Sequence, residues 1–122
     1  MKYDCEIMGD VNVVHIREPR LTSHEAPEMK TALLGLIVSD NEKILIDMGD
    51  VEFIDSTGLG SFLFGIRQAD QYEKDLRFCN LRPRILQLVQ IAQLQNVIDP
   101  YRSIQEALDD FEMDDAEDDE PG

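Results

Sequence analysis

The stretch that decides the fold is Ile54-Asp55-Ser56-Thr57-Gly58-Leu59-Gly60. Residues 43–48 before it form a continuous apolar run between polar turns, which is typical of a buried strand. Residues 57–72 after it carry apolar side chains at helical spacing. The hydroxyls of Ser56 and Thr57 therefore lie where a loop enters a helix, at the positive end of the helix dipole. A phosphoryl group on Ser56 would be tolerated there and would change the surface charge sharply.

The rest of the chain alternates between strand-like and helix-like segments. Gly9 and Asp10 form the turn of a hairpin between residues 3–8 and 11–16. A helix capped by Ser23, with Pro27 in its first turn, is expected to end near residue 40. The further predicted elements are loops over 17–22 and 49–55, a strand at 76–81, a helix opened by Pro83, a short edge strand at 96–99 and a last helix with a capping box at 103–106.

This order of elements, ββαβαβαβα, predicts an α/β fold. Strands that alternate with helices give parallel crossover connections, and the initial hairpin adds an antiparallel pair. We therefore expect a mixed sheet of about five strands covered by about four helices. Function gathers at the carboxyl ends of the strands in such sheets, and the region from Asp47 to Thr57 is such an end.

The composition limits the possible partners. The 122 residues carry a formal net charge of −15, and 43% of them are hydrophobic. These values suit one domain with a single core, and the negative charge argues against direct binding of nucleic acid or an anionic membrane. No apolar run approaches the roughly 20 residues that span a bilayer, and residues 1–6 lack the apolar core of a signal peptide. The expected location is therefore the cytoplasm.

The negative charge is concentrated at the end of the chain. Residues 109–122 contain nine Asp or Glu and no Lys or Arg, which leaves −6 for residues 1–108. We expect one domain over residues 1–112 and an acidic, disordered tail over 113–122. A solubilising role for this tail is favoured, and the alternative is a tail that competes for a basic surface on a partner.

Cys5 and Cys79 fall in strand-like segments. Without an export signal, two buried free thiols are favoured over a disulfide. Neither cysteine has a second cysteine or a histidine at metal-ligand spacing, so the sequence predicts no metal site and no cofactor. His15 and His24 are interpreted as structural residues.

Asp47, the loop to Phe53 and the Asp-Ser-Thr-Gly-Leu-Gly core at 55–60 resemble the STAS family, most closely the bacterial anti-sigma factor antagonists. The resemblance covers roughly residues 3–112 and implies a STAS-like fold and a regulatory protein that is not an enzyme. In that family the serine matching Ser56 is phosphorylated by an anti-sigma factor that is itself a serine kinase. The unmodified antagonist binds this kinase, the phosphorylated form releases it, and a metal-dependent, PP2C-like phosphatase resets the switch.

The resemblance assigns phosphorylation to Ser56, with Thr57 as the alternative acceptor. The predicted partner surface comprises Asp55, Ser56, Thr57, Gly58, Leu59, Gly60, Leu21 and Thr22. Many family members carry a Gly-x-Leu/Ile-Asp turn where this chain has Pro19, Arg20, Leu21 and Thr22. Because the glycine and the aspartate of that turn are missing, the identity of the partner stays open. The oligomeric state also stays open, with a monomer among the options.

Several of these residues also have a structural interpretation. Either Ser56 or Asp55 could cap the helix. The glycines at 58 and 60 could present a flat surface to a partner or permit tight packing of the helix. Asp47 is favoured as a residue that holds the loop through hydrogen bonds.

Two other functions remain open from the sequence. The first is a phosphorylation-independent STAS scaffold subunit of a transporter or a stress-sensing complex, which the acidic tail and the altered loop suggest. The second is a small enzyme that holds a metal with Asp47, Asp50 and Asp55 and receives phosphate on a carboxylate. An acyl-transfer enzyme is poorly supported, because Ser56 has no Gly-x-Ser-x-Gly elbow.

Overall fold

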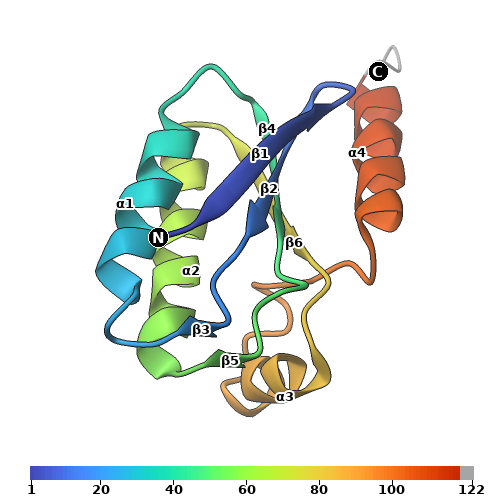
Figure 1. The fold of residues 1–122 in the computed structure, drawn as a ribbon. Helices are drawn as coiled ribbons and strands as arrows, with labels where there is room; N and C mark the ends of the chain where they lie inside the picture. Colours follow the sequence, from blue (N-terminus) through green and yellow to red (C-terminus); the bar gives the residue numbers. More distant parts are fainter. Residues whose placement is uncertain (119–122) are drawn as a thin grey trace.

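Four strands form the central sheet, in the order β1-β2-β4-β6 (Figure 1). The structure is a computed structural model that describes residues 1–118. Its elements are β1 (Tyr3–Met8), β2 (Val11–Ile16), β3 (Arg20–Leu21), α1 (Ala26–Ile37), β4 (Lys43–Asp47), β5 (Phe53–Ile54), α2 (Ser56–Gln71), β6 (Asp75–Cys79), α3 (Pro83–Ile91) and α4 (Ile104–Asp118). The predicted α/β fold with a mixed sheet and helical cover is confirmed.

The strand pairing follows from the turn and crossover chemistry of the sequence. β1 and β2 form the predicted antiparallel hairpin, with Met8 opposite Val11 across a two-residue turn. Gly9 in that turn has φ +65°, a backbone conformation that glycine adopts without a steric penalty. β2, β4 and β6 run parallel to one another, and helices supply the crossover connections between them. The carboxyl ends of these three strands therefore meet at one end of the sheet.

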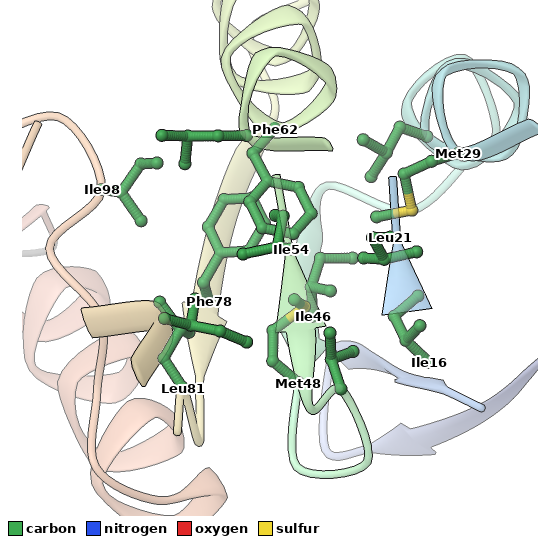
Figure 2. Close-up of a cluster of buried hydrophobic side chains, with 14 of the residues drawn as sticks. Ile16, Leu21, Met29, Ile46, Met48, Ile54, Phe62, Phe78, Leu81 and Ile98 are labelled. Atoms are coloured by element: carbon green, nitrogen blue, oxygen red, sulfur yellow. The ribbon is translucent and has the colours of Figure 1, made fainter. Parts of the chain in front are cut away.

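Helices cover both faces of this sheet. α1 and α2 lie side by side on one face and α4 lies on the other, while α3 lies at the end below β6 (Figure 1). The larger core is between the sheet and the first pair of helices, where the rings of Phe62 and Phe78 are 5.1 Å apart (Figure 2). A smaller core under α4 contains Val11, Val13, Leu45, Cys79, Ala107 and Phe111. The start of α2 is thus fixed by the larger core.

Two segments predicted as loops contain a short second sheet. β3 and β5 pair in parallel, with Arg20 opposite Phe53 and Leu21 opposite Ile54. The carbonyl of Pro19 accepts hydrogen bonds from the N–H groups of Glu52 (2.8 Å) and Phe53 (3.1 Å), which extends the pairing. This small sheet holds the segment before α2 against the segment before α1.

The predicted edge strand at 96–99 is wrong. This segment forms turns, in which the N–H groups of Val97 and Ile98 both donate to the carbonyl of Leu94. Pro100 has no N–H to donate to a neighbouring strand. The chain meets the edge of the sheet one residue later, where Tyr101 forms an isolated parallel bridge with Cys79.

The boundaries of α1 also differ from the prediction. The helix begins at Ala26 and ends at Ile37, and Ser23 does not cap it. The carbonyl of Thr22 accepts from the N–H groups of Glu25 and Ala26, so a turn over residues 22–26 leads into the helix. Pro27 lies in the first turn, as predicted.

The predicted disordered tail differs from the structure over residues 113–118, because α4 continues to Asp118. The helix is held against β6 by Arg77, whose guanidinium is ion-paired with Asp75, Asp110 and Asp114. The same guanidinium stacks 4.0 Å above the ring of Phe111. Residues 119–122 of the predicted tail lie outside the described residues.

The two cysteines differ in their burial. Both cysteines are free thiols, but Cys5 is exposed rather than buried because β1 is an edge strand. Burial raises the pKa of Cys79 to about 12. Within residues 1–118, no helix has both the length and the apolar character needed to cross a membrane.

Candidate functional site

Ser56 is the first residue of α2, and its side chain is exposed together with that of Thr57. Asp55 before it has extended backbone angles and is the N-cap of the helix. The Asp55 carboxylate accepts a hydrogen bond from the N–H of Gly58 through Oδ1, at 2.8 Å. Capping therefore belongs to Asp55, and within residues 1–118 no hydrogen bond occupies the Ser56 hydroxyl.

The Asp55 carboxylate also ties the start of α2 to the segment before α1. Its Oδ2 accepts from the N–H of Ser23 at 3.2 Å, and its own N–H donates to the carbonyl of Leu21 at 3.3 Å. The hydroxyl of Thr22 donates to Glu25 Oε2 at 2.6 Å, which fixes the following turn. The exposed surface around Ser56 is thus built from two separate segments that one carboxylate joins.

The residues of the predicted partner surface divide into exposed and supporting positions. Ser56 and Thr57 are exposed, and Asp55, Gly60 and Thr22 are partly exposed. Leu21, Gly58 and Leu59 are buried, so these three support the surface and do not form it.

Gly58 is required for packing rather than for close approach of a partner. A Cβ added at this position would lie 2.1 Å from the carbonyl oxygen of Leu21 and 2.7 Å from Ile54 Cγ1. A Cβ added at Gly60 would meet nothing within 4 Å. The sequence suggested the same two alternatives for both glycines. In the structure, only Gly58 is required for tight packing, and Gly60 has open space beside it.

The loop that leads to the site is held by Asp47 at the end of β4. Its Oδ1 accepts from Gly49 N (3.0 Å) and Asn80 Nδ2 (2.9 Å), and its Oδ2 is 2.6 Å from His15 Nδ1. Burial disfavours the charged carboxylate, but the hydrogen bonds from Asn80, His15 and Gly49 outweigh burial and lower the pKa of Asp47. The expected structural role of Asp47 is supported by these contacts.

His15 lies between two carboxylates. Its Nε2 is 2.8 Å from Glu6 Oε1, and only 14% of its side chain is exposed. Burial opposes the charged imidazole, but the hydrogen bonds with Glu6 and Asp47 raise the pKa of His15 above its ordinary value. The structural interpretation of this histidine agrees with its two partners.

The three carboxylates considered as a metal site do not converge. Asp47 is occupied by Gly49, Asn80 and His15, while Asp50 Oδ2 accepts from Arg17 at 3.0 Å and Asp55 binds backbone N–H groups. In the described part of the chain, no group of three His, Cys, Asp or Glu side chains could hold a metal ion. The arrangement of Asp47, Asp50 and Asp55 therefore does not support the metal site suggested for these three carboxylates.

The sequence gives no sign that Arg20 lies at the same end of the molecule as Ser56. Its guanidinium stacks 4.7 Å above the ring of Phe53, and the side chain is exposed. The contact depends on the pairing of β3 with β5, which two-residue strands do not reveal in a sequence. The contact places the Arg20 guanidinium on the surface formed by β3 and β5, the two strands that lead into α1 and α2.

A model of the STAS domain matches residues 2–107 of the chain. Over 79 residues the chain is 30% identical to the anti-sigma-B factor antagonist of Listeria monocytogenes, covering 65% of this chain and 69% of that protein.

Solved structures with the same fold include a putative anti-sigma factor antagonist from Thermotoga maritima, with a TM-score of 0.76, 20% identity, and coverage of 88% of this chain and 92% of that one. The Bacillus cell fate determinant SpoIIAA in its phosphorylated form is also similar, with a TM-score of 0.65, 18% identity, and coverage of 90% and 99%.

Proposed function

The chain belongs to the STAS domain family, and we propose that it acts as an anti-sigma factor antagonist whose partner binding is switched off by phosphorylation of Ser56. The observation that carries the proposal is the exposed, uncommitted hydroxyl of Ser56 at the first position of α2, next to a carboxylate that is already fixed. The match to a relative named anti-sigma-B factor antagonist supports the class of partner.

The position of Ser56 suits a kinase substrate. The hydroxyl is on the surface, and its loss as a donor would leave no buried group unpaired. A phosphate there would face the first N–H groups of α2 and the positive end of its dipole. The domain therefore tolerates the modification without refolding.

The same modification changes the surface strongly. Asp55 contributes one negative charge, and both of its oxygens accept from neutral backbone N–H groups rather than from a cation. A phosphate adds about −1.5 to −2 charges beside it at pH 7. A partner shaped for the unmodified surface would meet repulsion and would have to desolvate a dianion. A loss of 3–4 kcal/mol would weaken binding by roughly a few hundred-fold.

The partner in this proposal is an anti-sigma factor that is a serine kinase, and a PP2C-like phosphatase removes the phosphate. The antagonist itself catalyses no reaction and works in the cytoplasm. The phosphorylation-independent scaffold remains the competing function, and it predicts that charge at Ser56 leaves binding unchanged.

A binding measurement with purified anti-sigma factor kinase separates these functions. Ser56→Ala should bind like the unmodified protein, and Ser56→Asp should bind at least about a hundred-fold more weakly. Ser103→Asp is the matched control, because Ser103 caps α4 through the N–H of Glu106 and Asp is an equally good cap. Equal binding by Ser56→Asp and the control would contradict the proposal and favour the scaffold.

A further inference from the structure

A groove lies between the tip of the β1–β2 hairpin and one side of α4. Its volume is about 370 Å³, and Val11 and Phe111, both buried, form its floor. Met8 and Leu108, which are partly exposed, continue the apolar lining. Because Val11 and Phe111 are only 2% and 1% exposed, Met8 and Leu108 supply the apolar surface that another molecule can reach, and this surface suits one side chain.

The rim of this groove carries exposed carboxylates, contributed by Asp10, Asp109 and Glu112. Asp10 is ion-paired with Lys43, and Asp109 accepts from Gln105. Across residues 1–118, neither Asp109 nor Glu112 forms an ion pair with a Lys, Arg or His. The rim thus keeps negative charge that its own domain leaves uncompensated.

The rest of α4 adds to this charge instead of reducing it. The helix contains eight Asp or Glu and no Lys or Arg between Ile104 and Asp118. Asp110 and Asp114 are ion-paired with Arg77 of β6, so these two carboxylates have a structural role in holding the helix to the sheet. Asp109 and Glu112, which line the groove, by contrast form no ion pair with the described part of the sheet.

We propose that this groove binds a positively charged protein segment that carries an apolar side chain. The apolar side chain would cover the exposed parts of Met8 and Leu108, and flanking Lys or Arg side chains would meet the carboxylates of the rim. Nucleic acid and anionic lipid are repelled by the same carboxylates. A free metal ion would gain nothing from Met8 and Leu108, whereas a basic protein segment with an apolar side chain matches both the apolar lining and the acidic rim.

This surface lies at the opposite end of the domain from Ser56. The hairpin tip lies beside α4 at one end of the sheet, whereas α2 begins beside β5 at the other end (Figure 1). Binding in the groove is therefore independent of charge at Ser56. It would let the protein keep one contact while the contact at the start of α2 is released.

The test uses a capped pentapeptide with one leucine flanked by two lysines on each side, titrated into the ¹⁵N-labelled full-length protein. We expect chemical-shift changes centred on Gly9, Val11, Leu108 and Glu112. Replacing the leucine by glycine should weaken binding about threefold to tenfold, because Met8 and Leu108 are then left uncovered. Shifts spread evenly over the acidic surface, or equal binding of both peptides, would overturn the proposal.

Matched variants test the contribution of the rim. The double variant Asp109→Asn with Glu112→Gln should bind the pentapeptide about fivefold more weakly. The control Asp70→Asn with Asp99→Asn removes the same charge from exposed positions outside the groove and should bind within twofold of the unmodified protein. Equal weakening in both variants would mean that overall charge, and not the groove, attracts the peptide. Ser56→Asp should bind the pentapeptide unchanged, which separates this proposal from the function proposed for Ser56.

Discussion

Gly58 is the position where the geometry of the site makes the sharpest prediction for stability. A Cβ at this residue would lie 2.1 Å from the carbonyl oxygen of Leu21, against a minimum of 3.0 Å that real Cβ atoms keep. That oxygen belongs to the backbone of β3 and accepts from Asp55 N, so it cannot move aside as the end of a flexible side chain would. Gly58→Ala must therefore push α2 away from the short second sheet.

The size of the effect follows from two opposing contributions. Alanine in a helix is more stable than glycine by about 1 kcal/mol. Overpacking costs typically 1–3 kcal/mol, and the rigid backbone neighbour places this site near about 3 kcal/mol. The expected net loss in the free energy of unfolding is about 2 kcal/mol, or roughly 8 °C in Tm for a domain of this size.

Gly60 supplies the matched control in the same helix. A Cβ there meets nothing within 4 Å, so Gly60→Ala should stabilise the protein by about 0.5–1 kcal/mol. Urea unfolding of both variants, followed by circular dichroism, gives the two free energies. If Gly58→Ala proved as stable as Gly60→Ala, the packing of α2 against β3 described above would be refuted.

Three further predictions concern other contacts. Because the pKa of His15 is raised in the folded protein, its pairing stabilises the fold fully below about pH 6.5, and this stabilisation is lost as the pH rises through the folded pKa. In urea unfolding between pH 5.5 and 8.5, the free energy of unfolding of His15→Gln should lack the decline with pH that the unmodified protein shows. The same pH dependence in both proteins would contradict the pairing. Asp55→Ala should lower the free energy of unfolding in urea by about 1–2 kcal/mol. Asp55→Asn should keep most of this stability, because asparagine also caps helices. Identical losses in the two variants would exclude the capping role of Asp55. Arg77→Met should speed amide hydrogen exchange in α4 at least tenfold, while the β1–β2 hairpin stays protected. The exposed control Arg67→Met should change the exchange of neither element. Equal exchange in both variants would show that Arg77 does not hold α4 against β6.

The sequence predicted elements that local chemistry determines. The hairpin of residues 3–8 and 11–16 has the predicted bounds, because Gly9 supplies the φ of the turn and the strands alternate around it. The position of Ser56 at the start of a helix was also predictable, since a buried strand, a polar loop and an amphipathic helix follow one another there.

Features that depend on contacts between distant segments could not be predicted. The pairing of Arg20–Leu21 with Phe53–Ile54 involves two residues in each strand, too few for a periodic signal. The role of Gly58 depends on the carbonyl of Leu21, which is 37 positions earlier in the chain. The segment 96–99 has strand-like composition, but Val97 remains about half exposed and the chain turns back to Leu94 instead.

Residues 113–118 of the predicted tail show the same limit. Their charge predicted disorder, yet α4 continues through them and Asp114 is ion-paired with Arg77. The net charge of a segment does not reveal a cation on another element, here Arg77 of β6, that compensates part of this charge.

Mapping the phosphate on the protein decides whether Ser56 is the residue that controls partner binding. The protein should be incubated with ATP and an anti-sigma factor serine kinase, and then examined by intact-mass and peptide mass spectrometry. We expect one added phosphate, located on Ser56, and none on Ser56→Ala. A phosphate on Thr57 in place of Ser56, or modification of Ser56→Ala to the same extent as the unmodified protein, would contradict the proposal.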